Sequence, residues 1–246
     1  MKARLNDNFS FGDLIAEIGC LFLNKPYKEK TLENQDKEKL VFNLSAFDCT
    51  TFVETVIALA QCAESGNFSP TQFKRYLKSI RYRQGKIQGY SSRLHYFTGW
   101  LRDHEKMRIL KDESKKLGGT PQRKKINFMT VHQEMYPALK NKTQLAKVAI
   151  TEKNLSRRVF HVIGTDKISA QKTNIQDGNI IAFTTNEKGL DVAHVGFAIR
   201  QGKNLHLLHA SKKEKRVVIS EKTLAAYLKS NKQFTGIIVA RVLEPC

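Results

Sequence analysis

One short segment is decisive for the fold: Phe47-Asp48-Cys49-Thr50-Thr51-Phe52-Val53-Glu54. Apolar residues recur at helical spacing from Phe52 onward, which predicts a helix over residues 49–63. Asp48 directly precedes this helix, and its carboxylate can accept hydrogen bonds from the first-turn amides as an N-cap. The sequence therefore predicts that Cys49 lies in the first turn of the helix.

A thiol at that position has the chemistry of a nucleophile. Unpaired backbone amides and the positive end of the helix dipole both stabilise a thiolate relative to a thiol. The same amides can bind the oxyanion that forms when a thiolate adds to a carbonyl. The alternative for Cys49 is a small buried hydrophobe, the usual role of a free cysteine. Cys62 fits that alternative, because it lies about 220° around the same helix from Cys49.

The cysteines do not indicate a disulfide framework or a metal centre. Cys20, Cys49, Cys62 and Cys246 form no C-x-x-C pair and have no zinc-like spacing with histidine. The chain also has no glycine-rich nucleotide loop. We therefore expect no metal and no cofactor.

A cysteine nucleophile needs a base, and residues 191–199 place His194 on a predicted strand. Strand alternation puts small residues beside His194, where they would let a helix end come close. If Gly202-Lys203 forms a two-residue hairpin turn, Gly196 pairs with His209, and His209 shares the face of His194. His206 then points away. A turn of odd length or a bulge would exchange the roles of the two later histidines.

Helices come first along the chain and strands follow, which predicts an α+β fold in a single domain over residues 1–246. Helices are expected over residues 10–24, 49–63, 69–79 and 93–106. Residues 64–160 are predicted to form a helical, loop-rich lobe. The main sheet is predicted within residues 175–246 as an antiparallel meander, with strands at 179–184, 193–200, 205–210, 216–220 and 236–242.

The chain is strongly basic, with 42 Lys and Arg against 23 Asp and Glu in 246 residues and a net charge of +19. This charge favours anionic partners, although scattered lysines can simply keep a protein soluble. No apolar run reaches the length of a membrane span. Asp7, Asp13 and Glu17 interrupt the apolar core that a signal peptide needs. We expect a cytoplasmic protein, or a periplasmic or cell-envelope protein from which a signal peptide has been removed.

The sequence resembles the NlpC-type branch of the papain-like superfamily. The shared pattern is a cysteine at a helix start, then a histidine on a strand, then a polar residue on the next strand. The match is closest to its N-acetylmuramoyl-L-alanine amidase-like branch, long catalogued as a domain of unknown function. The matching segments, in order, are residues 22–27, 31–33, 48–54, 92–97, 189–196 and 208–211. Asn24-Lys25 and Asn179 depart from the pattern, which usually has Gly-Thr and Asp at these places.

The resemblance implies a papain-like core, in which the nucleophile helix packs on an antiparallel sheet. It also implies that Cys49 is the nucleophile, that His194 is general base and then acid, and that His209 orients His194. The implied reaction is hydrolysis of the amide between N-acetylmuramic acid and L-alanine in peptidoglycan or a muropeptide.

Substrate recognition is predicted at Arg93, His95 and Tyr96, with Tyr27 as a further contact. A muropeptide carries carboxylates suited to Arg93 and sugar faces suited to aromatic stacking. The alternative is that this segment belongs to an amphipathic helix whose apolar members are core. The oligomeric state is left open.

Three other functions remain possible from the sequence. An endopeptidase of the same superfamily would cut between D-Glu and the diamino acid of the stem peptide. A zinc amidase would need an H-E-x-x-H motif, which the chain lacks. A nucleic-acid-binding module would fit the charge, but no recognised binding motif accompanies it, so we expect no nucleic-acid partner.

Overall fold

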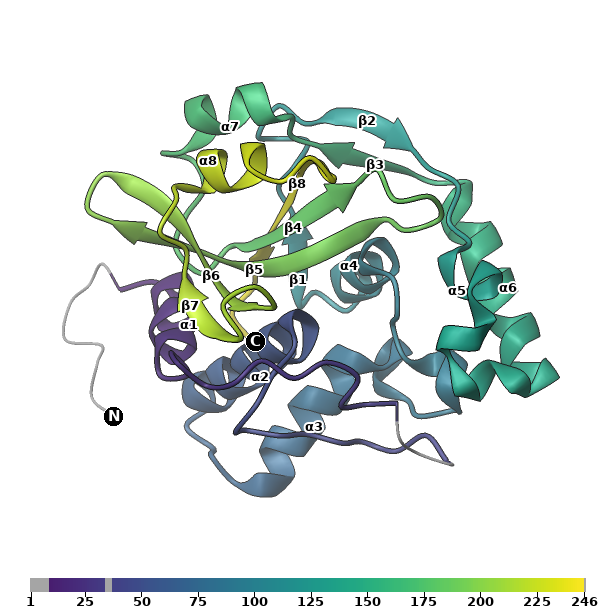
Figure 1. The fold of residues 1–246 in the computed structure, drawn as a ribbon. Helices are drawn as coiled ribbons and strands as arrows, with labels where there is room; N and C mark the ends of the chain where they lie inside the picture. Colours follow the sequence, from purple (N-terminus) through teal and green to yellow (C-terminus); the bar gives the residue numbers. More distant parts are fainter. Residues whose placement is uncertain (1–8, 34–36, 246) are drawn as a thin grey trace.

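The computed structural model describes residues 9–33 and 37–245, and a six-stranded antiparallel sheet forms its centre (Figure 1). Asp7 and Cys246 lie outside the described residues. The strands follow the order β1 (Leu110–Asp112), β8 (Phe234–Val242), β4 (Ile180–Thr185), β5 (Val192–Gln201), β6 (Asn204–Ser211) and β7 (Arg216–Ile219). A separate two-stranded sheet pairs β2 (Thr120–Arg123) with β3 (Val159–Val162). This mixed architecture confirms the α+β class.

Helices cover both faces of the large sheet. The α-helices are α1 (Phe11–Cys20), α2 (Cys49–Glu64), α3 (Pro70–Arg81), α4 (Phe97–Lys106), α5 (Phe128–Val131), α6 (Lys142–Ser156), α7 (Thr165–Gln171) and α8 (Leu224–Lys229). Short 3₁₀ turns are η1 (Arg83–Gly85), η2 (Tyr90–Ser92), η3 (Gln133–Met135) and η4 (Pro137–Lys140). No helix within the described ranges is long and apolar enough to span a membrane.

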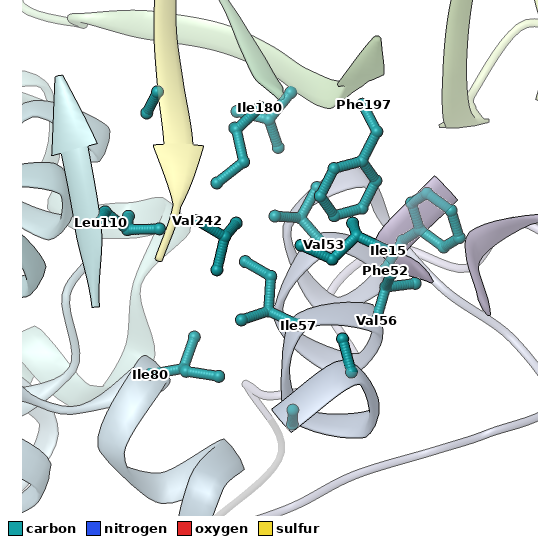
Figure 2. Close-up of a cluster of buried hydrophobic side chains, with 14 of the residues drawn as sticks. Ile15, Phe52, Val53, Val56, Ile57, Ile80, Leu110, Ile180, Phe197 and Val242 are labelled. Atoms are coloured by element: carbon teal, nitrogen blue, oxygen red, sulfur yellow. The ribbon is translucent and has the colours of Figure 1, made fainter. Parts of the chain in front are cut away.

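The main core lies between the sheet and the layer of α1, α2 and α3 (Figure 2). Phe52, Val56 and Ile57 of α2 are fully buried. The Phe52 ring packs edge-on against Phe197 of β5, with ring centroids 5.9 Å apart. A second core on the other face joins strand residues to α7 and α8. The sheet and its core therefore fix the start of α2 relative to β5.

The hairpin between β5 and β6 has the predicted register. Phe197 pairs with Leu208 and Ile199 with His206, as a two-residue turn at residues 202–203 requires. Strands β4 to β7 form the expected meander. The last strand differs from the prediction, because β8 returns to lie beside β4 instead of β7. Its middle residues are apolar and buried on both faces, which suits an interior position in the sheet.

Two helix boundaries differ from the prediction. The helix predicted over residues 10–24 ends at Cys20. The helix predicted over 93–106 begins only at Phe97, because Arg93 and Tyr96 are extended. A distant carboxylate supplies the missing cap: Asp191 accepts hydrogen bonds from Thr98 N at 2.7 Å and Thr98 Oγ1 at 2.8 Å. The start of α4 is therefore tied to the residue that precedes β5.

The region predicted as a helical lobe, residues 64–160, also contributes to the sheets. Its β1 extends the edge of the main sheet beside β8, with Leu110 opposite Val242. Its β2 and β3 form the small sheet. The pairing of β1 with β8 connects the region to the main sheet, which a local pattern of helices and loops did not indicate.

A buried ion pair connects α2 to α3. Arg81 Nε lies 2.7 Å from Glu54 Oε2, and both side chains are at most 4% exposed. Arg81 also donates to the Val41 carbonyl. Removing one partner of a buried pair leaves an uncompensated charge in the core.

Replacing Arg81 with methionine is therefore expected to lower the free energy of unfolding by about 3–5 kcal/mol. Denaturant unfolding measures this loss. The matched control is Arg241→Met: Arg241 is 51% exposed and lies 3.1 Å from Glu113, so its loss should cost less than about 1 kcal/mol. Equal losses in the two variants would contradict a structural role for the Glu54–Arg81 pair.

Candidate active site

Cys49 is the first residue of α2, as the sequence predicts. Asp48 caps the helix by accepting from Thr51 N at 2.7 Å, and Thr51 Oγ1 accepts from Asp48 N at 3.0 Å. This reciprocal pair fixes the direction in which the chain enters the helix. Cys49 is partly exposed, and its Sγ lies 4.0 Å from Thr50 Oγ1.

The protonation state of the thiol differs from the expectation of a resting thiolate. Burial raises the pKa of Cys49 to about 11, and the neighbouring Asp48 carboxylate adds to that increase. The Val195 and Thr50 amides act in the opposite direction but do not outweigh burial. Burial also lowers the pKa of His194 to about 4. Each group is therefore neutral at pH 7, and a nucleophilic thiolate forms only when the thiol proton moves to a base.

His194 and His209 form a hydrogen-bonded pair. His194 Nε2 lies 2.7 Å from His209 Nδ1, and the two rings are nearly perpendicular. If the shared proton is on His194 Nε2, the Nδ1 lone pair of His194 is free to accept a proton. His206 takes no part, because its Nδ1 lies 2.8 Å from the Ser220 carbonyl oxygen. The predicted position of His209 beside His194, with His206 directed away from the pair, is confirmed; the catalytic roles of these residues stay a prediction.

Two backbone features position this pair. The register between β4 and β5 shifts next to His194, which leaves Ala193 as an extra residue in β5. Such bulges redirect side chains beside active sites. Gly196 provides space for His209, because a Cβ at Gly196 would lie 2.9 Å from His209 Cβ and 2.8 Å from the Leu208 oxygen. The small residue thus makes room for the second histidine, not for a helix end as we had expected.

Cys49 and His194 line the same cavity, which has a volume of about 80 Å³. One wall is apolar and comes from Leu94, Phe97 and Trp100. The sequence pattern indicates these residues only as core, and they are indeed largely buried. The structure shows that they also shape the space next to the thiol.

His95 is the predicted substrate-binding residue that the structure places in this cavity. Its Nε2 lies 2.9 Å from the Tyr90 carbonyl oxygen, and its ring packs against the Tyr90 ring at an angle of 38°. Burial, with a smaller contribution from the Arg93 charge, lowers the pKa of His95 to about 3. His95 is therefore neutral, with the proton on Nε2 and Nδ1 free to accept a hydrogen bond.

Arg93 lies outside the cavity lining and already has carboxylate partners. Its guanidinium lies 2.7 Å from Glu33 and 2.8 Å from Glu38, and it stacks on the Tyr90 ring. It also donates to the Leu32 carbonyl. We expected the Arg93 guanidinium to be free to bind a substrate carboxylate, whereas the structure pairs it with two carboxylates of the protein. A role of Arg93 in substrate recognition stays a prediction.

Tyr96 and Tyr27 also lie outside the cavity lining. The Tyr96 hydroxyl donates to Glu152 at 2.6 Å and accepts from Met129 N at 2.9 Å, inside a separate apolar cluster. Tyr27 is half-buried; burial and the nearby Cys49 and Asp48 raise its pKa. Tyr27 is therefore close to the thiol, whereas Tyr96 stabilises the neighbouring lobe.

Two carboxylates, Asp191 and Glu54, lie near the site although the sequence pattern did not indicate them as site residues. Asp191 is 1% exposed, and its pKa is raised by burial. It connects the start of α4, which supplies a cavity wall, to the start of β5, which supplies His194. Glu54 also lines the cavity, but its carboxylate is paired with Arg81. Within residues 9–33 and 37–245, no group of three or more His, Cys, Asp or Glu side chains could hold a metal ion.

The lowered pKa of His194 predicts activity that persists in acid. The neutral His194 imidazole, the form that can accept a proton, remains the main form down to about pH 4. We expect kcat/KM at pH 5 to be within about twofold of its value at pH 7, whereas an ordinary histidine would give a loss of about 25-fold. A steep fall below pH 6.5, with the fold intact by circular dichroism, would contradict the assignment of this buried histidine.

Known proteins share this architecture. A family model described as AmiA-like, N-acetylmuramoyl-L-alanine amidase-like, matches residues 17–237. The chain belongs to this AmiA-like family. The resemblance identified from the sequence is therefore confirmed at the level of the family. No curated protein matches the chain.

Solved structures agree with the AmiA-like assignment. An N-acetylmuramoyl-L-alanine amidase from Bacteroides uniformis is 38% identical with a TM-score of 0.91, over 95% of this chain and 99% of that one. A Bacteroides fragilis protein that carries the name of a xylanase is 41% identical with a TM-score of 0.87, over 92% and 100%. A Legionella pneumophila protein of the family DUF1460 shares only the fold, at 22% identity and a TM-score of 0.72, over 97% and 92%.

Proposed function

We propose that this AmiA-like protein is a cysteine amidase that cleaves the amide between N-acetylmuramic acid and L-alanine in peptidoglycan fragments. The observation that carries the proposal is the convergence of Cys49 and His194 on one cavity, with His194 hydrogen-bonded to His209. The similarity to an amidase from Bacteroides uniformis supports the choice of bond. A nucleophile helix packed on an antiparallel sheet is the arrangement expected of a papain-like core.

The reaction proceeds in two steps. Cys49 Sγ attacks the lactyl carbonyl carbon while its proton passes to His194, and backbone amides at the start of α2 stabilise the oxyanion. The carbon–nitrogen bond then breaks, His194 protonates the leaving amine of L-alanine, and a thioester remains on Cys49. In the second step His194 takes a proton from water, which hydrolyses the thioester and restores the thiol. His209 accepts the Nε2–H of the imidazolium form of His194 and holds the ring in place.

The dimensions of the cavity fit small substituents at the scissile bond. A volume of about 80 Å³ with an apolar wall accommodates methyl groups, and the lactyl and alanine residues each present one. His95 offers a hydrogen-bond acceptor to the polar part of the substrate. Arg93 and Tyr96 instead form hydrogen bonds to backbone groups of the protein, at Leu32 and Met129. A protein with this substrate would act in the periplasm or cell envelope once a signal peptide has been removed.

Mass spectrometry of products from a defined muropeptide tests the proposal. Cleavage at the proposed bond releases N-acetylmuramic acid and a peptide with a free L-alanine amino group. Products that arise only from cleavage between D-Glu and the diamino acid would replace the amidase assignment with an endopeptidase. A thiol-alkylating reagent should abolish turnover, whereas a chelator should leave it unchanged; the opposite result would indicate a zinc amidase.

The name of the Bacteroides fragilis relative raises a glycosidase as a second candidate. Most glycoside hydrolases place two carboxyl groups about 5–9.5 Å apart on either side of the scissile bond. Among the described residues that line the Cys49 cavity, Glu54 is the one carboxylate, and Arg81 neutralises it. This cavity therefore lacks the pair of acids that such chemistry uses.

A further inference from the structure

A second hollow lies on the far side of α4 from the candidate active site. Gly99, Arg102, Asp103 and Lys106 line it from α4, and Arg158 lines it from the chain that follows α6. At about 100° per residue, these α4 positions lie on the helix face opposite the one that carries Phe97 and Trp100. The hollow has a volume of about 290 Å³ and is separate from the Cys49 cavity.

Four cationic side chains line this basic hollow: Arg83, Arg102, Lys106 and Arg158. Asp103 is its one carboxylate, and it already accepts a hydrogen bond from Gln84 N at 2.8 Å. The hollow therefore has a surplus of positive charge. Burial and the charges of Arg102 and Arg83 together lower the pKa of Arg158, so these groups are close enough to repel one another.

The arginines of the basic hollow lack the partners that other arginines in this protein have. Arg81 pairs with Glu54, and Arg93 pairs with Glu33 and Glu38. Within the described part of the chain, Arg83, Arg102 and Arg158 form no ion pair. Glu105 and Asp112 line a neighbouring hollow that shares Arg102 and Arg158, but neither carboxylate lies within ion-pair distance of them. Several guanidinium groups that line one hollow without an ion-pair partner can together bind an anion.

We propose that the basic hollow binds a phosphate group carried by a diphosphate or a phosphorylated sugar. A carboxylate would neutralise only one of the four cations, whereas a phosphate monoester carries nearly two negative charges and three strong acceptor oxygens. Guanidinium forks match these oxygens in pairs. Asn154 lines the same hollow and adds an amide donor. The volume exceeds that of a single phosphate, which leaves room for a second phosphate or a sugar ring.

Calorimetric titration of the intact protein with three probes at constant ionic strength tests this proposal. The probes are inorganic phosphate, pyrophosphate and N-acetylglucosamine 1-phosphate. Tighter binding of pyrophosphate would indicate a diphosphate ligand, and tighter binding of N-acetylglucosamine 1-phosphate would indicate a phosphorylated sugar. We expect saturable binding of one probe per chain. The double variant Arg102→Gln/Arg158→Gln should bind at least about tenfold more weakly. The control Lys203→Gln/Lys229→Gln removes the same charge from exposed sites elsewhere and should bind as the wild type does.

Two results would overturn the proposal: no saturable binding of any probe by the wild type, or equal weakening in the arginine and lysine variants. If the arginine variant does not fold, amide chemical shifts of the wild type provide the test. Phosphate should then shift Gly99 and leave Val195, beside Cys49, unchanged, whereas the reverse pattern would contradict the proposal. Binding is measured without turnover, so its failure would leave the proposed amidase activity untouched.

Discussion

Replacing Cys49 with alanine is expected to abolish hydrolysis of a muropeptide while the protein stays folded. No other described thiol lines the cavity that contains His194. Loss of the nucleophile in another hydrolase costs about 10⁶-fold in kcat, so turnover should fall below detection. Cys49 lies at the margin of the main core, at a helix end. The change to alanine removes only its sulfur atom, so the melting temperature should change only slightly. Product formation and thermal unfolding measure the two effects.

Cys62 provides the matched control. It lies on the same helix but is 1% exposed and packs in the main core. Cys62→Ala should cost about 1 kcal/mol of stability and preserve turnover. Wild-type turnover by the Cys49 variant, or a large rate loss in the Cys62 variant with normal melting, would remove the basis for a Cys49 mechanism.

The second large effect is expected at the histidine pair. His194→Ala should reduce kcat/KM almost as much as loss of Cys49 does, because groups that act as a unit are non-additive. His209→Ala should have a smaller effect, between about 10- and 10⁴-fold, since we propose that His209 only orients His194. His206→Ala should be nearly neutral for catalysis, because His206 is bonded to the Ser220 carbonyl.

Steady-state kinetics of the three histidine variants on one muropeptide measure this order. The double variant Cys49→Ala/His194→Ala should be no slower than Cys49→Ala alone. A larger loss in His206→Ala than in His209→Ala would show that the hydrogen-bonded pair does not set the catalytic geometry. Equal, small losses in His194→Ala and His206→Ala would remove the proposed base.

The features that the sequence predicts well depend on short segments. Asp48 and Thr51 are three residues apart, so their capping box and the position of Cys49 follow from local chemistry. The two-residue turn after β5 fixes the register of β6, and with it the proximity of His194 and His209. Both are set within a few residues of the chain and need no knowledge of the rest of the fold.

Features that depend on distant contacts were missed or misplaced. Asp191 caps α4 from 93 residues away, so local periodicity predicted a helix start several residues too early. Arg93 has its carboxylate partners in the segment before Cys49, and residue type alone suggested that it was free for a ligand. Burial decides the protonation of Cys49, and burial depends on the β5 strand that packs beside it. None of these contacts has a counterpart in local sequence spacing.

The most direct test of the proposed chemistry is the mass of the acyl group on the enzyme. Wild-type protein mixed with a defined muropeptide and quenched in acid within one turnover should carry an added mass equal to the N-acetylmuramoyl group, and peptide mapping should place it on Cys49. A Cys49 adduct that contains the L-alanyl-D-glutamyl part of the stem would contradict amidase specificity. An adduct on any other residue would contradict the account of Cys49 as the nucleophile.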